Sequence, residues 1–192
     1  MLRSLYDWTM AKAGSKAGEK WLGAISFAES SFFPIPIDIM LIPMILAKPA
    51  AAWRLATITL VMSVLGGMAG YLIGWGLYET VGKPIIEFYG YTAQFEAFAG
   101  YYADYGILIV LVAGFTPIPF KVVTIASGVV GMNPLVFFLT SIPARGARFY
   151  LVAGLLWKWG EAMRGFIEQR LGLVTSGMLA LGVAGFVVIK YI

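Results

Sequence analysis

Long apolar stretches alternate with short polar ones along this chain. Residues 55–78, 134–157 and 173–190 each form a mostly apolar run, close to the roughly 20 residues that a helix needs to cross a bilayer. Two further apolar regions, 20–46 and 105–131, are long enough to cross but contain prolines. The pattern predicts an all-α polytopic membrane protein with a single domain over residues 1–192.

Composition supports a membrane protein and limits the kinds of catalytic and metal-binding site that the chain can form. The 192 residues are 60% hydrophobic and 12% charged, whereas soluble domains carry about 25% charged residues. The chain has no Cys and no His, which removes disulfides, the commonest general base and the commonest metal ligand. We therefore expect no cofactor, no metal site and no enzymatic activity. The net charge of +4 is attributed to cytoplasmic Lys and Arg rather than to nucleic-acid binding.

The two proline-containing regions share a motif. Residues 32–38 read Phe-Phe-Pro-Ile-Pro-Ile-Asp, and residues 115–121 read Phe-Thr-Pro-Ile-Pro-Phe-Lys. Proline lacks a backbone N–H, so Pro34 and Pro36, and later Pro117 and Pro119, are expected to break the helix. A duplicated interrupted segment is typical of a transporter substrate site. The alternative is two proline-rich turns that are alike by chance.

Lys and Arg in the short loops predict the orientation. They gather in the N-terminal region, in 47–54 and in 158–170, whereas the connector 79–104 has one Lys and four acids. If 20–46 is a re-entrant hairpin, the three basic regions and the N-terminus are cytoplasmic. The second hairpin, 105–131, then enters from the opposite face, giving an inverted repeat of hairpin plus transmembrane helix. If 20–46 spans instead, the scheme fails.

The remaining segments complete the predicted topology. Residues 1–18 are expected to form an interfacial helix or a polar tail, and 173–190 a C-terminal transmembrane helix. Within 55–78, Gly66, Gly70 and Gly74 recur every four residues, with Ser63 and Gly67 on an adjacent ridge. This stripe of small residues predicts close helix packing.

Five charged residues fall in or near the apolar segments: Glu29, Asp38, Lys121, Arg145 and Arg148. A charged side chain in the hydrocarbon core of the bilayer is energetically costly unless it pairs with an opposite charge. We therefore expect Asp38 beside Lys121 where the hairpins meet. Lys121, Arg145 and Arg148 are candidates for binding an anionic head group. Glu29 and Asp38 are candidates for proton coupling or gating. The alternative is a static salt-bridge network that fixes the hairpins.

At these residues the chain resembles the DedA family, also called the VTT or SNARE-associated domain family, and most closely its small YqaA-type branch. The resemblance is carried by Ile-Ser-Phe-Ala-Glu-Ser-Ser-Phe-Phe-Pro-Ile-Pro-Ile-Asp at 25–38, Ser-Val-Leu-Gly-Gly-Met-Ala-Gly-Tyr at 63–71, Gly-Phe-Thr-Pro-Ile-Pro-Phe-Lys at 114–121 and Arg-Gly-Ala-Arg-Phe at 145–149.

The resemblance implies two facing re-entrant loops and a role in moving lipids across bilayers. Relatives act as flippases or scramblases for phospholipids or polyprenyl phosphates, and several are linked to the proton gradient. The membrane acids of the family correspond to Glu29 and Asp38. The better-known branch has an Arg on either side of the second loop's proline, where this chain has Gly114 and Phe120.

These observations together predict a flippase- or scramblase-like transporter of the bacterial inner membrane. Its substrate would be a lipid with an anionic phosphate head group, and coupling to protons is left open. The alternatives are a proton or small-ion transporter and a non-transporting assembly factor. The lipid, the direction and self-association into a homo-oligomer are not determined by the sequence.

Overall fold

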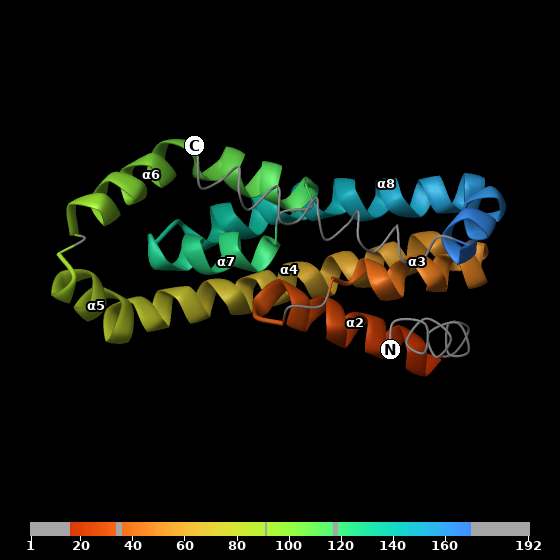
Figure 1. Cartoon of the computed structure of the whole chain (residues 1–192), viewed down its shortest axis with the longest axis horizontal. Coiled ribbons are helices and arrows are strands. Elements are labelled where there is room, and N and C mark those ends of the chain that lie inside the picture. Colours follow the sequence, from red (N-terminus) through yellow and green to blue (C-terminus); the bar gives the residue numbers. More distant parts are fainter. Residues whose placement is uncertain (1–15, 34–35, 91, 117–118, 170–192) are drawn as a thin grey trace.

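The structure, a computed structural model, describes residues 16–33, 36–90, 92–116 and 119–169 (Figure 1). Its elements in chain order are α2 (Lys16–Ser31), α3 (Asp38–Ala47), the 3₁₀ turn η1 (Pro49–Ala51), α4 (Ala52–Leu77), the π-helical turn η2 (Tyr78–Gly82), α5 (Lys83–Phe88), α6 (Thr92–Phe115), α7 (Phe120–Val129) and α8 (Pro134–Gln169). The all-α prediction is confirmed for these ranges. The predicted helix 173–190 and most of 1–18 lie outside them.

Within the described residues, three helical stretches are long and apolar enough to cross a membrane: Pro49–Phe88, Phe95–Phe115 and Pro134–Gly160. Within the first and third, α4 and α8 pack side by side in opposite directions. Their contacts include Tyr71 stacked on Phe137, with ring centroids 5.5 Å apart, and Thr57 bonded to Tyr150, with 2.8 Å between the hydroxyl oxygens. The two long helices form a frame for the rest of the molecule.

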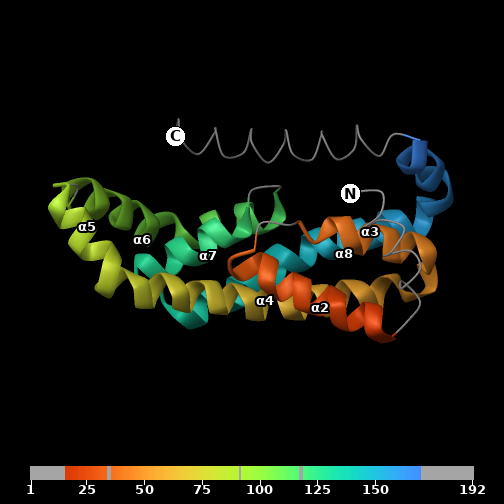
Figure 2. The ribbon, with the colours of Figure 1, turned by 60° about the horizontal axis from the view of Figure 1, so that its bottom comes forward.

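Both proline-containing regions are bent helix pairs. The first pair, α2 and α3, is interrupted between Ser31 and Asp38, and the second, α6 and α7, between Phe115 and Phe120. Pro36 and Pro119 stand in these bends, as predicted, whereas Pro34 and Pro117 lie outside the described residues. The bends lie near the middle of the α4–α8 frame, and the pairs extend from them toward opposite ends (Figures 1 and 2).

The helix that leads to the second bend begins earlier than expected, at Thr92 rather than at residue 105. The aromatic residues of the connector give it a packed face: Phe95 stacks on Tyr78, and the Tyr102 hydroxyl lies 2.7 Å from Ser127 Oγ. The four acids, by contrast, are exposed: Glu79, Glu87, Glu96 and Asp104. The acids thus form a solvated face, and half of the predicted connector 79–104 is part of α6.

The glycine stripe on α4 is a packing surface, as predicted. A Cβ at Gly66 would lie 2.1 Å from the Phe27 carbonyl oxygen in α2, and one at Gly74 would lie 2.0 Å from the Ile125 carbonyl oxygen in α7. Since real Cβ atoms do not approach oxygen so closely, only glycine allows these helices their separation. The stripe therefore seats α2 near the middle of α4 and α7 nearer its C-terminal end.

The buried apolar side chains of the described residues form two clusters, one on each side of the bends. One contains Leu22, Leu41 and Phe149 and joins α2, α3, α4 and α8. The other contains Tyr71 and Phe120 and joins α4, α6, α7 and α8. The buried charged residues lie where the two clusters meet.

Candidate functional site

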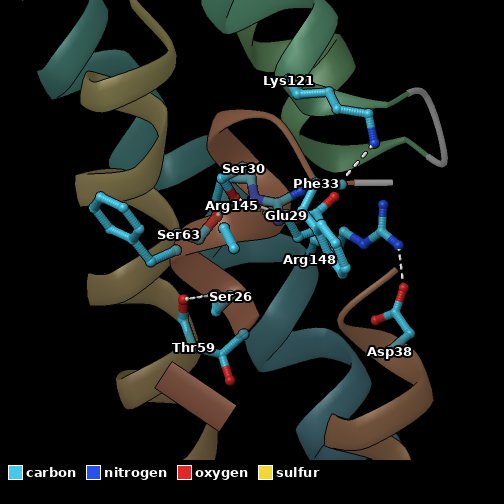
Figure 3. A network of polar contacts seen from close by, with 12 residues as sticks. Ser26, Glu29, Ser30, Phe33, Asp38, Thr59, Ser63, Lys121, Arg145 and Arg148 are labelled. Atoms are coloured by element: carbon cyan, nitrogen blue, oxygen red, sulfur yellow. Dashed lines mark hydrogen bonds and ion pairs between the residues drawn. The ribbon is translucent and has the colours of Figure 1, made fainter. Parts of the chain in front are cut away.

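Arg145 of α8 is the centre of a buried polar cluster (Figure 3). Its Nη2 atom lies 3.0 Å from Glu29 Oε2, and its Nε atom lies 2.7 Å from Ser63 Oγ. Only 2% of the Arg145 side chain and 11% of the Glu29 side chain are exposed. These residues come from α8, α2 and α4, so the cluster ties the first bend to the frame.

The hydroxyl groups close this cluster into a ring. Ser63 Oγ lies 2.7 Å from Ser30 Oγ, which lies 3.1 Å from Glu29 Oε2. Each serine has one proton, and Arg145 only donates, so the bonds run from Arg145 to Ser63, from Ser63 to Ser30, and from Ser30 to Glu29. Both serines then donate and accept, and the Glu29 oxygen accepts twice. We call Arg145, Ser63, Ser30 and Glu29 the closed ring.

Two aromatic rings cover the guanidinium of Arg145. Its Cζ atom lies 4.9 Å from the centroid of Phe120 and 4.6 Å from that of Phe149. The faces of aromatic rings attract cations, most strongly where water is excluded. Arg145 is therefore in contact with one phenylalanine of each apolar cluster.

Arg148, one turn further along α8, forms a second and more open pair. Its Nη2 atom donates to Asp38 Oδ2, the carboxylate at the start of α3. Its Nη1 atom donates to the carbonyl oxygen of Thr116, next to the end of α6, at 2.7 Å. The Arg148 side chain is 18% exposed. One arginine thus bonds to both bends, and we call Arg148 and Asp38 the outer pair.

The second oxygen of Asp38 is unsatisfied. Among the buried side-chain nitrogen and oxygen atoms of the described residues, Asp38 Oδ1 is the one without a hydrogen-bond partner. The Asp38 side chain is only 4% exposed. A buried acceptor without a donor is destabilising by about 1–3 kcal/mol. Asp38 is therefore held less completely than Glu29.

Lys121 does not pair with Asp38, and that prediction is wrong. Lys121 Nζ instead donates to the carbonyl oxygen of Phe33 at 3.0 Å, across the gap between the bends. Phe33 follows the end of α2, where carbonyl groups lack helical partners and the helix dipole is negative. Arg148 occupies the carboxylate that Lys121 was expected to reach. Lys121 is partly exposed.

The described residues contain no group of three or more acidic side chains that could hold a metal ion. The predicted charged residues nevertheless come together: two ion pairs, Glu29–Arg145 and Asp38–Arg148, and one further cation, Lys121. With every group ionised, the five carry a net charge of +1. Arg145 is enclosed, whereas Arg148 and Lys121 are partly accessible.

Two curated proteins match almost the whole chain. A protein of Haemophilus influenzae described as uncharacterized is 37% identical over 187 residues, which is 97% of each chain. The uncharacterized protein HI0703 homolog of Histophilus somni is 36% identical over 187 residues, again 97% of each. The chain belongs to the family of these two proteins. No protein-family model and no solved structure matches it.

Sequence reasoning missed the hydroxyl groups of the site. Ser63 was interpreted as a small packing residue beside the glycine stripe, yet it accepts a hydrogen bond from Arg145. Thr124 Oγ1 lies 3.2 Å from the Ser30 carbonyl oxygen and so links α7 to α2. These residues could have been predicted from their hydroxyl groups on otherwise apolar helices, since such groups hydrogen-bond to neighbouring helices in membranes.

Proposed function

We propose that the protein is a membrane transporter that moves a lipid with an anionic phosphate head group across the bilayer. The observation that carries the proposal is the position of two accessible cations, Arg148 and Lys121, where the bends meet. Arginine gives phosphate paired hydrogen bonds, and lysine adds a point charge. Three exposed phenylalanines at the bends suit the apolar part of such a molecule: Phe32, Phe33 and Phe115.

The aromatic residues support a particular placement in the bilayer. Trp53 and Trp75 stand 22 residues apart in α4 and are both exposed, a separation of about 33 Å that is close to the roughly 30 Å hydrocarbon core. Trp53 lies against Tyr150 and Trp157, and near Trp75 the ring of Tyr78 stacks on Phe95. Tryptophan and tyrosine favour the two interfaces. The closed ring then lies near the bilayer centre, because Ser63 is midway between the two tryptophans.

The same placement supports two re-entrant hairpins in an inverted repeat. Although α6 is long enough to span, it ends beside Arg148. From Arg148, α8 continues to Gly160, about 18 Å further at 1.5 Å per residue. α6 therefore stops inside the hydrocarbon and α7 returns from it, while α2 and α3 do the same from the other face. Broken backbone at this depth is tolerated where protein covers it.

Charge gives the proposed orientation. Lys48, Arg54 and Lys158 lie at the end of the frame that carries Trp53, whereas the exposed acids Glu79 and Glu87 lie at the other end. The positive-inside rule places the basic end in the cytoplasm. Because the two relatives come from bacteria, we place the protein in the bacterial inner membrane with the start of α2 in the cytoplasm.

The resemblance to the DedA family supports a lipid substrate. Where its better-known branch has two arginines, Gly114 packs against Ala144 and Phe120 is buried against the guanidinium of Arg145. We propose that Lys121 and Arg148 supply the positive charge that those two arginines provide in the other branch. Arg145 would hold the first bend in place through the closed ring. Glu29 and Asp38 would act in gating. Whether protons are coupled depends on these two acids.

Single cysteines test the proposed topology, since the chain has none of its own. We expect Lys20→Cys and Lys48→Cys to react with a membrane-impermeant maleimide only from the cytoplasmic side. Glu96→Cys and Asn133→Cys should react only from the opposite side, because each hairpin returns to the face from which it entered. Reaction of Lys20→Cys and Lys48→Cys from different compartments would show that α2 and α3 together span.

Loss of Arg148 should abolish lipid transport. We expect Arg148→Gln in liposomes to move fluorescent phosphatidylglycerol no faster than protein-free vesicles, because the head group loses its paired donor. Dithionite quenching of the inner-leaflet label measures the rate. The matched control is Arg54→Gln, which removes the same charge from an exposed pair with Glu19 and should transport normally. A wild-type rate in Arg148→Gln would refute the assignment.

Two other functions remain as alternatives and are separable in the same vesicles. A proton or small-ion transporter would change the signal of an enclosed pH-sensitive or ion-sensitive dye without moving the labelled lipid. A non-transporting assembly factor would show neither activity. For such a factor, exchanging the charges of the outer pair, with Asp38→Arg and Arg148→Asp, should preserve function in cells.

A further inference from the structure

Arg148 is already occupied in this conformation. One nitrogen donates to the Asp38 carboxylate and another to the Thr116 carbonyl oxygen. An incoming phosphate would seek the same guanidinium edges, because carboxylate and phosphate oxygens use the same geometry toward arginine. The site therefore contains an anion that belongs to the chain itself.

The two carboxylates of the site are held very differently. Glu29 Oε2 accepts two hydrogen bonds inside the closed ring. Asp38 has one bonded oxygen and one buried oxygen with no donor. A carboxylate with an unsatisfied buried oxygen is easier to displace, since leaving the site lets that oxygen find a donor. Asp38 is thus suited to leave Arg148, whereas Glu29 is suited to stay with Arg145.

We propose that Asp38 is the resident ligand of the Arg148 anion site and competes with the phosphate group for it. The proposal rests on the proposed function in one respect, that the external ligand carries a phosphate. Binding then requires Asp38 to release Arg148, and departure of the phosphate lets Asp38 return. Release of the head group is therefore assisted from within the chain, which prevents Arg148 from retaining it.

Displacement of Asp38 also removes one of the links between the two bends. Asp38 begins α3 in the first hairpin, and Thr116 lies at the end of α6 in the second. Arg148 joins them through its two bonds. A phosphate that takes the place of Asp38 leaves α3 without this tie and so couples occupancy of the site to the position of the first bend.

The test is the affinity of the purified full chain for phosphate groups when Asp38 is neutralised. Isothermal titration in a neutral detergent would use two probes, dihexanoyl phosphatidic acid and inorganic phosphate. We expect Asp38→Asn to bind phosphatidic acid about tenfold more tightly than the wild type, because the competing charge-assisted hydrogen bond is gone. If inorganic phosphate shows the same gain in affinity, the site recognises the phosphate group alone. If only phosphatidic acid shows the gain, the glycerol and acyl chains contribute to binding as well.

Three variants serve as controls. Glu79→Gln changes the net charge by the same amount, but Glu79 is an exposed acid of η2 outside the site, so the affinity of this variant should stay within about twofold of the wild type. Asp38→Glu keeps the competing carboxylate and should not bind more tightly. Asp38→Asn combined with Arg148→Gln should lose the gain. A size-exclusion profile and heat-unfolding midpoint for each variant show that the protein is folded.

The outcomes separate this inference from the proposed function. Tighter binding in Asp38→Asn together with no lipid movement in vesicles would support the competition and refute the transporter. Equal affinities of Asp38→Asn and the wild type would overturn the competition even if lipid moves. An equal gain in Glu79→Gln would also overturn it, because the effect would then be general electrostatics.

Discussion

Glu29→Ala is expected to lower the stability of the protein by about 3–5 kcal/mol, because it leaves a buried guanidinium without its partner. Arg145 is 2% exposed, and Glu29 is the carboxylate with which it forms an ion pair. The substitution also opens the closed ring, since Ser30 loses the oxygen to which it donates. Heat unfolding in detergent, followed by tryptophan fluorescence, measures the change.

Two comparisons identify the cause of this loss. Glu29→Leu with Arg145→Met removes both charges and should recover much of the stability, because an apolar pair of similar size avoids an unpaired charge. Glu19→Ala breaks the ion pair with Arg54, whose side chain is 60% exposed, and should change stability by less than about 1 kcal/mol. An unchanged unfolding midpoint in Glu29→Ala would mean that Arg145 is not enclosed as described.

Gly74→Ala is expected to destabilise the protein by at least about 2 kcal/mol, since it forces α7 away from α4. The added Cβ would lie 2.0 Å from the Ile125 carbonyl oxygen and 2.9 Å from its carbonyl carbon, and neither backbone atom can rotate away. Gly66→Ala should have a similar effect through Phe27 of α2. The midpoint of heat unfolding and the yield of folded protein in membranes report both changes.

Gly76→Ala is the matched control on the same helix. A Cβ there would meet no neighbouring helix within 4 Å, so alanine should be neutral or stabilising by up to about 1 kcal/mol through its higher helix propensity. Opposite signs for Gly74→Ala and Gly76→Ala would establish close packing as the reason for the stripe. Equal losses at both positions would instead indicate a general intolerance of α4 to substitution.

Local chemistry made parts of this fold predictable from the sequence. Proline lacks an amide donor wherever it stands, so the breaks around Pro36 and Pro119 follow from the residues alone. The spacing of Gly66, Gly70 and Gly74 likewise defines one face of a helix before any partner is known. Such features depend on a few neighbouring positions and hold in almost any tertiary arrangement.

The pairing of the charges could not be predicted in the same way. Asp38 had two cationic candidates, and the choice depends on how far the second bend inserts and how α8 is rotated about its axis. The structure pairs Arg148 with Asp38 and directs Lys121 to a backbone oxygen. The start of α6 was misplaced because its acids favour a connector, whereas its aromatic side chains pack on η2 and α7.

The glycine contacts have a mechanical consequence. α4 touches the backbone of α2 at Phe27 and that of α7 at Ile125, so both are clamped where their main chains meet. α3 is held by side chains instead, among them Met40 and Met44, which adapt easily to new neighbours. It follows that α3 is the helix best able to change its orientation. Release of Asp38 would then allow this short helix to tilt while the other helices keep their positions.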